Sequence, residues 1–170
     1  MIKIRQHNKT DIPFRVAWLN NPKANRFIGD MSGRKTTLRA QRQWFDNYLK
    51  DKSKKFFTIC DDKTPVGFMG LTKIDQVRRN ADLFIIIGED KYRGRGFGKL
   101  AMLYLIDYGF KKLKLHKMYL GVYKENKQAL KLYKKLGFKV EGILKDETIA
   151  GGKFHDLLFM AIFNKGDKKI

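Results

Sequence analysis

The chain has 170 residues, of which 43% are hydrophobic and 13% aromatic, so it can fill one hydrophobic core and is not of disordered composition. No apolar stretch is long enough to span a bilayer, the first residues do not begin a signal peptide, and the lone cysteine excludes an internal disulfide. We therefore expect one domain over residues 1–170 that is cytoplasmic and has no membrane partner.

The charge is strongly basic, with 37 Lys and Arg against 17 Asp and Glu and a formal net charge of +20. Such an excess attracts polyanions, namely nucleic acid, an anionic membrane surface or a phosphorylated small molecule. A lysine-rich surface also arises from genome-wide composition bias. The net charge alone therefore does not identify the binding partner.

The first third of the chain predicts one strand and two helices. Alternating apolar residues indicate a strand over residues 1–5, and Asp11 with Pro13 begins a helix that Asn21-Pro22 should stop. We expect residues 23–35 to be irregular. Thr36 or Thr37 can cap a second helix that continues to about residue 49.

The rest of the chain alternates strands with helices. Strands are predicted over residues 55–60, 66–74, 81–88 and 117–122, with two more between residues 138 and 163 around the turn at Gly151-Gly152. Helices are predicted over residues 99–113 and 126–136, the second ended by Gly137. This order indicates a mixed α/β (α+β) sheet domain.

Three glycines and three cations lie between the third of these strands and the next helix, in the stretch RGRGFGK from Arg93 to Lys99. A helix N-terminus exposes unpaired N–H groups and the positive end of its dipole, and glycines let an anion approach them. The stretch therefore indicates a phosphate-binding loop, although a flexible turn with solvated arginines is the simpler alternative. The glycine spacing fits neither the dinucleotide fingerprint nor the Walker loop.

Two motifs together resemble those of the GNAT superfamily of N-acetyltransferases. The first is Arg-x-x-Gly-x-Gly over residues 93–98, and the second is Asn-x-x-Ala-x-x-x-Tyr-x-x-x-Gly-Phe-x-x-Glu over residues 126–141. They occur in the family's order, about 30 residues apart, and the predicted element order fits as well. The resemblance implies a mixed, mostly antiparallel sheet of about seven strands with about four helices, splayed at its middle strands.

The resemblance also implies acetyl-coenzyme A as the acetyl donor, and because the sequence has no clustered set of His, Cys and carboxylate ligands we expect no metal. The pyrophosphate would be held by the glycine loop, the pantetheine arm would pair with the third hairpin strand, and a later helix would contact the cofactor. The residues so implied are Arg93, Gly94, Arg95, Gly96, Phe97, Gly98 and Lys99 for the loop, Ile85, Ile86 and Ile87 for the strand, and Asn126 and Ala129 for the helix.

Two residues are candidates for the chemistry. Tyr133 occupies the place where the family commonly has a tyrosine that protonates the leaving thiolate, and a phenol, with a pKa of about 10, suits that role. Asp82 occupies the place of a strand glutamate that deprotonates the amine. The alternatives are a purely packed Tyr133 ring and an Asp82 carboxylate paired with Arg78 or Arg79.

The stretch WLNNPKANRFI near the start resembles the opening of one branch of the family, whose members acetylate protein N-termini, amino-sugar nucleotides or spermidine. The acceptor therefore stays open among three classes: a polyamine, an amino sugar or sugar nucleotide, and a protein N-terminus. A polyamine site needs carboxylates, and the first 50 residues hold only Asp11, Asp30 and Asp46 against eleven Lys and Arg. We therefore place an amino sugar or related small amine first and the N-terminus of a protein, including a ribosomal protein, second. A non-catalytic RNA- or ribosome-binding module is a further alternative, although no RNA-binding motif supports it. A homodimer is compatible with the sequence.

Overall fold

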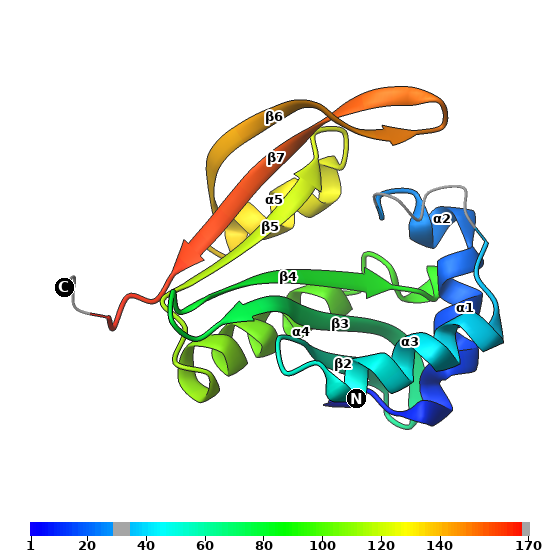
Figure 1. The fold of residues 1–170 in the computed structure, drawn as a ribbon. Helices are drawn as coiled ribbons and strands as arrows, with labels where there is room; N and C mark the ends of the chain where they lie inside the picture. The colour runs from blue at the N-terminus through cyan, green and yellow to red at the C-terminus, as the bar shows by residue number, and fades with distance from the viewer. Residues whose placement is uncertain (29–34, 168–170) are drawn as a thin grey trace.

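The computed structural model describes residues 1–28 and 35–167. Its centre is a seven-stranded sheet in the order β1-β2-β3-β4-β5-β7-β6, antiparallel except for the pairing of β4 with β5 (Figure 1). The strands are β1 (Ile2–Gln6), β2 (Lys55–Asp61), β3 (Thr64–Asp75), β4 (Asn80–Ile87), β5 (Lys117–Tyr123), β6 (Lys139–Ala150) and β7 (Lys153–Phe163). The mixed, mostly antiparallel sheet expected from the family resemblance is confirmed.

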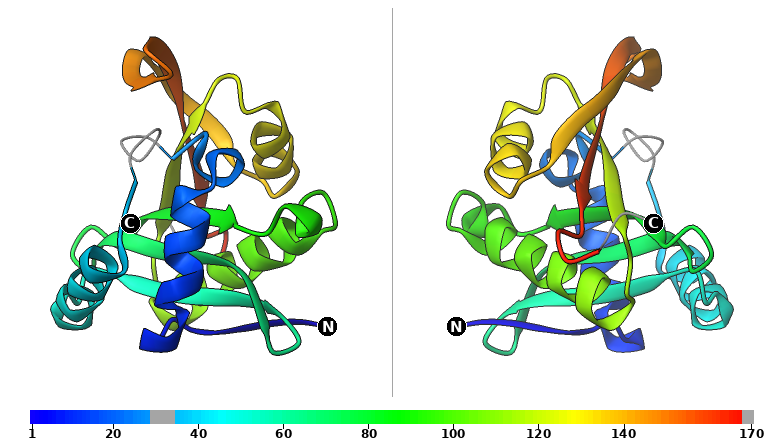
Figure 2. Two further views of the ribbon diagram at one scale, coloured as in Figure 1. Left: turned by 90° about the vertical axis from the view of Figure 1, so that its right-hand side faces the viewer. Right: turned by 90° about the vertical axis from the view of Figure 1, so that its left-hand side faces the viewer.

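Five α-helices accompany the sheet in the described part of the chain: α1 (Ile12–Asn20), α2 (Pro22–Asn25), α3 (Leu38–Lys50), α4 (Phe97–Asp107) and α5 (Lys127–Lys135). α3 and α4 lie on opposite faces of the strands β2 to β4, and α5 lies on the same side as α4 (Figure 2). Single-turn 3₁₀ helices at Lys9–Asp11 and Asp90–Tyr92 and a π-helical turn at Tyr108–Lys112 complete the helical segments described.

The helix boundaries follow local capping. The side chain of Thr37 accepts a hydrogen bond from the N–H of Ala40 and begins α3, and Gly137, with a φ of 96°, follows the end of α5. The sequence reading of residues 23–35 as irregular is wrong for the first of them. The side chain of Asn21 caps α2 by accepting a hydrogen bond from the N–H of Lys23, and Pro22 takes the first position of that helix. An Asn-Pro pair can therefore begin a helix as well as end one.

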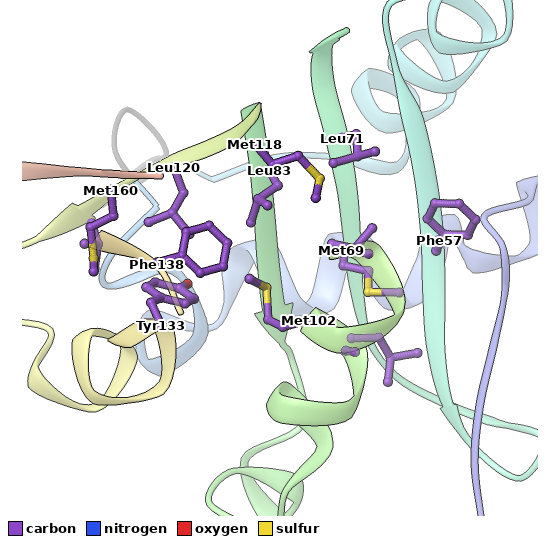
Figure 3. Close-up of a cluster of buried hydrophobic side chains, with 14 of the residues drawn as sticks. Phe57, Met69, Leu71, Leu83, Met102, Met118, Leu120, Tyr133, Phe138 and Met160 are labelled. Atoms are coloured by element: carbon purple, nitrogen blue, oxygen red, sulfur yellow. The ribbon is translucent and has the colours of Figure 1, made fainter. Parts of the chain in front are cut away.

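The main core lies between the sheet and the helices α4 and α5. It contains Met69, Leu83, Met102, Met118 and Leu120, and Tyr133 and Phe138 extend it under β5 (Figure 3). On the other face, α1 and α3 cover the sheet with two smaller clusters, one around Trp18 and Phe68 and one around Phe45 and Phe56. Both faces of β4 are therefore packed, which fixes the direction in which its backbone edge points.

Candidate active site

The two middle strands of the sheet pair only at their beginnings. Residues Asn80 to Asp82 of β4 pair in parallel with Lys117 to Tyr119 of β5, and the strands then diverge (Figure 1). β4 continues its antiparallel pairing with β3 up to Ile87, so its other edge is left without a strand partner beyond Asp82. This is the splay that the sequence led us to expect.

The free edge of β4 presents alternate backbone groups. The N–H of Gly88 donates to the carbonyl of Val66 at 2.9 Å, so residues 88, 86, 84 and 82 direct their backbone groups toward β3. By the same alternation, the N–H and C=O groups of Leu83, Ile85 and Ile87 face the gap. An extended ligand arm can therefore bond to the odd-numbered residues, whereas Ile86, which the sequence analysis included, is turned to β3.

A cavity of about 750 Å³ occupies the gap between β4 and β5. It runs from the aromatic side chains near α2 to the N-terminus of α4. The predicted residues that line it are Ile85, Ile86, Ile87, Arg93, Gly94, Gly96, Gly98, Lys99, Asn126, Ala129 and Tyr133. Asp82, Arg95 and Phe97 do not line it.

The glycine loop shapes one end of this cavity. Gly94 and Gly96 have φ values of 72° and 87°, in the left-handed region that other residues rarely adopt, and Gly96 is the N-cap of α4. A Cβ atom on either glycine would meet no atom within 4 Å, so the space above the backbone is open. The first N–H groups of an 11-residue helix thus point toward an open, glycine-lined site, which suits an anion.

The remaining side chains of the loop have different surroundings. Phe97 is buried and packs edge-on against Tyr92, with ring centroids 4.9 Å apart, so only its backbone is available to a ligand. Arg95 and Lys99 are exposed, and Lys99 lies in the first turn of α4. Arg93 donates hydrogen bonds to the carbonyls of Ile87 and Lys23.

Asn126 and Ala129 form the opposite wall at the start of α5. The Asn126 side chain accepts a hydrogen bond from the N–H of Ala129 at 3.1 Å and so caps the helix. Ala129 leaves room because its side chain is a single methyl group. Asn126 therefore has a structural task in addition to its place on the cavity wall.

Tyr133, a buried residue of α5, is one of the residues that line the cavity. Its ring packs with Phe138, with centroids 5.8 Å apart, in the main core (Figure 3). Burial raises the pKa of its phenol to about 12, so the hydroxyl carries its proton at neutral pH. The packed ring and the cavity-lining position are thus both present in one residue.

Asp82 lies at the point where β4 and β5 begin to separate. Its carboxylate is 3.6 Å from the ammonium of Lys73, and burial raises its pKa despite that cation. The expected alternative partners are wrong: Arg79 pairs with Asp167 and Arg78 with Asp75. The reason is an irregularity of β3 between Thr72 and Asp75, where Lys73 has a φ of 50°.

Sequence reasoning missed the wall of the cavity that α2 and β5 provide. Lys23, Ala24, Phe27 and Ile28 line it from the N-terminal part, and the ring of Phe27 packs against that of Tyr123 at 5.5 Å. No local pattern identifies these residues. The one available signal was the strand KMYLGVY itself, because a strand opposite the predicted free edge of β4 must face the same gap.

The charge of the cavity is positive in the part of the chain that the structure describes. Lys23, Arg93 and Lys99 line it, and no Asp or Glu is among the described lining residues. Asp30, one of the few acidic residues near the N-terminus, lies outside the described residues. The described lining therefore suits phosphate groups and offers no counter-ion to a polycation.

Comparison with known protein families shows to which family the chain belongs. Residues 2–139 match the family model described as an acetyltransferase (GNAT) domain. The chain belongs to the GNAT family. The family that the two sequence motifs indicated is therefore confirmed.

The chain is similar to several individual GNAT proteins. It is 39% identical over 119 residues to spermidine N(1)-acetyltransferase of Escherichia coli K12, a match that covers 70% of this chain and 63% of that protein. It is 34% identical over 119 residues to the Vibrio cholerae enzyme of the same name, covering 69% and 68%. It is 27% identical over 149 residues to acetyltransferase PseH of Campylobacter jejuni, covering 86% and 90%.

A solved structure gives the same fold. The Vibrio cholerae spermidine N-acetyltransferase in complex with CoA and spermine superposes with a TM-score of 0.90 at 28% identity, over 95% of each chain. That GNAT protein binds CoA. In this chain, no described helix has the length and apolar character needed to cross a membrane.

Proposed function

We propose that this chain transfers an acetyl group from acetyl-coenzyme A to a primary amine by direct attack in a ternary complex. The observation that carries the proposal is the cavity between the splayed strands, which is lined both by the glycine-rich N-terminus of α4 and by the buried Tyr133. Membership of the GNAT family and the CoA-bound relative support it.

The residues of the cavity fit coenzyme A. The N–H groups at the start of α4, with Lys99 beside them, match the charge of a pyrophosphate. The outward-facing backbone groups of Ile85 and Leu83 match the amide groups of the pantetheine arm. The bound donor supplies the thioester, whose reactive end would lie toward Tyr133.

The chemistry then needs two proton transfers and one polarising group. We propose that Asp82, which does not itself line the cavity, accepts the proton of the attacking amine through water as the C–N bond forms. The Tyr133 hydroxyl donates its proton to the sulfur as the C–S bond breaks. A gap-facing N–H of β4, at Leu83 or Ile85, polarises the thioester carbonyl.

For the acceptor, we propose a small amine that carries no second positive charge, with an amino sugar or its nucleotide first. The described lining holds no carboxylate, and an uncompensated second ammonium group would be costly to desolvate there. A polyamine is the second candidate, because two of the similar proteins are named spermidine acetyltransferases. These two observations oppose each other, so acceptor choice must be measured.

The test is an acceptor panel with release of free thiol as the readout. We expect a sugar-nucleotide amine to exceed spermidine in kcat/KM by ~10-fold or more, which is the size of discrimination that one unpaired charge produces. A higher kcat/KM with spermidine than with the sugar-nucleotide amine would show that the acceptor is a polyamine. No turnover with any amine, together with RNA binding and no affinity for acetyl-coenzyme A, would contradict the acetyltransferase itself.

A further inference from the structure

Arg93 is the most extensively bonded side chain at the edge of the cavity. Its Nε and Nη2 groups both donate to the carbonyl of Ile87 at 3.2 Å, and its Nη1 group donates to the carbonyl of Lys23 at 3.0 Å. Nη2 also lies 3.2 Å from Oδ1 of Asp90. Of the five N–H groups of a guanidinium, one on Nη1 is then left for any other partner.

These partners belong to two parts of the molecule that are far apart in sequence. Ile87 is the last residue of β4, and Asp90 begins the turn that leads into the glycine loop. Lys23 is in α2, which lines the cavity together with β5. Arg93 therefore ties that wall to the end of the strand whose free edge faces the cavity.

Neighbouring contacts strengthen the same connection. Asp90 accepts a hydrogen bond from the side chain of Asn21 at 3.4 Å and lies 3.6 Å from the ammonium of Lys23. One turn earlier, the indole of Trp18 donates to Glu89 at 2.8 Å. The contacts of Asp90 depend on the turn that Arg93 holds, because both residues flank the same 3₁₀ helix.

We propose that Arg93 is a positioning residue for the acceptor wall formed by residues 23–28, rather than a ligand of the cofactor's pyrophosphate. The proposal rests on the proposed function, since it takes that wall to contact the acceptor. It assigns the pyrophosphate to the backbone of residues 94–98 and to Lys99. It also assigns the carbonyl of Ile87 to Arg93, so that pairing with an extended ligand begins at Ile85.

The chemistry of the side chain distinguishes the two roles. A planar guanidinium can bridge two carbonyls and a carboxylate at once, whereas a lysine ammonium on a flexible stem acts on a phosphate mainly as a point charge. Lysine at position 93 would therefore keep most of a pyrophosphate contact but lose the bridge between β4 and α2. α2 has only four residues, and the last carbonyls of a helix need partners outside it; Arg93 supplies one to the carbonyl of Lys23.

The experiment compares Arg93→Lys, Arg93→Ala and Asp90→Asn with wild type. The matched control pair is Arg78→Lys and Arg78→Ala, because Arg78 is an exposed arginine that pairs with an aspartate three residues away and lies outside the cavity. Three quantities are measured: the dissociation constant of CoA by calorimetry, KM and kcat for the best acceptor, and amide hydrogen exchange in residues 19–28.

We expect both Arg93 variants to raise the acceptor KM by ~10-fold, the usual size of a lost positioning contact, while CoA affinity changes by less than about threefold. Exchange in residues 19–28 should accelerate in both, and Asp90→Asn should show the same changes to a smaller degree. The Arg78 variants should match wild type in every measurement.

A different pattern would overturn the proposal. If Arg93→Ala weakened CoA binding by ~10-fold and Arg93→Lys restored it, Arg93 would be a phosphate ligand. Unchanged exchange and unchanged acceptor KM in Arg93→Lys would also refute it. If Arg93→Ala fails to fold, Arg93→Lys and Asp90→Asn decide alone. Hydrogen exchange and CoA binding need no acetyl transfer, so they separate this proposal from a failure of the proposed function.

Discussion

At the scale of single residues, Tyr133 has two roles, one for its aromatic ring and one for its hydroxyl group. The ring contributes to the main core beside Phe138, and the same residue lines the cavity. Burial raises the pKa of the phenol to about 12, which keeps the proton on oxygen at neutral pH but makes it a weak acid until a thiolate develops nearby. A substitution that removes only the oxygen therefore tests the chemistry without disturbing the packing.

Tyr133→Phe should leave the free energy of unfolding and CoA affinity nearly unchanged. Turnover should fall by ~10²-fold, because a positioned general acid contributes about that factor. The decrease should be smaller with an acyl donor whose leaving thiol has a lower pKa, since a better leaving group needs less protonation. Steady-state rates with two donors measure this, and an equal loss with both would indicate a misplaced thioester instead.

Asp82 is the second residue whose role a conservative change can test. Asp82→Asn should slow the reaction mainly at low pH, where the amine is protonated and needs a base, and less at high pH, where free amine is available. Burial raises the pKa of Asp82, so in wild type the lower limb of the pH–rate profile should lie above the range of an exposed aspartate. A uniform loss at every pH would assign Asp82 to the ion pair with Lys73 alone.

At the scale of elements, the end of β4 is fixed by α1. The indole of Trp18 lies directly over Gly88, where a Cβ atom would overlap its ring, and its N–H bonds to Glu89 at 2.8 Å. Trp18 also stacks on Phe68 of β3, with ring centroids 6.0 Å apart. Glycine at position 88 is thus required by a close helix–strand contact.

Gly88→Ala should displace Trp18 and destabilise the fold by ~1–3 kcal/mol, the usual cost of overpacking a filled site. Because α1 continues into α2, the acceptor KM should rise as well. The control is Gly142→Ala in β6, where a Cβ atom meets nothing within 4 Å and the change should stay within about 0.5 kcal/mol. Urea denaturation measures the stability of both variants. Equal unfolding midpoints for Gly88→Ala and Gly142→Ala would contradict the packing argument.

The individual elements also show how much of the structure could be predicted from the sequence. The strands, α3, α4 and α5 were predictable because each has its own periodicity and caps, such as Thr37 and Gly137. The glycine loop and Tyr133 were predictable because their motifs are local. The part of the cavity wall formed by residues 23–28 was not predictable. Asn21-Pro22 can end one helix and begin another, and the contact of Phe27 with Tyr123 depends on the tertiary fold. The partners of Arg93 were not predictable either, because one guanidinium can serve a phosphate or two carbonyls.

At the scale of the whole molecule, β1, α1, β2 and α3 meet at a buried polar cluster. His7 has a fully buried side chain, with Nδ1 2.8 Å from Oγ1 of Thr58 and 3.5 Å from Asp11. Arg15 is close by, between the rings of Trp44 and Phe68. Burial, with Arg15 and Arg5 adding repulsion against the attraction of Asp11, lowers the pKa of His7 to about 4.

This histidine should make the fold sensitive to acid. Below pH 6.5 the unfolded chain binds a proton at position 7 that the native chain does not take up until about pH 4. The stabilisation is therefore complete above pH 6.5 and is lost as the pH falls toward 4, by at most ~3 kcal/mol. Chemical denaturation between pH 4 and 8 measures the slope.

The comparison for this slope is His7→Gln, which keeps a polar group near Thr58 but cannot titrate. It should be less stable at pH 7 and should depend less on pH between 6.5 and 4. Parallel curves for His7→Gln and wild type would show that another group titrates in this window.

The brief pairing of β4 with β5 has a mechanical meaning for the molecule. In the described part of the chain, the backbone hydrogen bonds between strands β1 to β4 and strands β5, β7 and β6 are confined to residues 79–82 and 116–119. The weakest cross-section of the sheet is thus the one that the cavity occupies. A ligand lying there would contact both halves of the sheet at the place where few backbone hydrogen bonds join them. We therefore expect that binding reduces the motion of one half relative to the other.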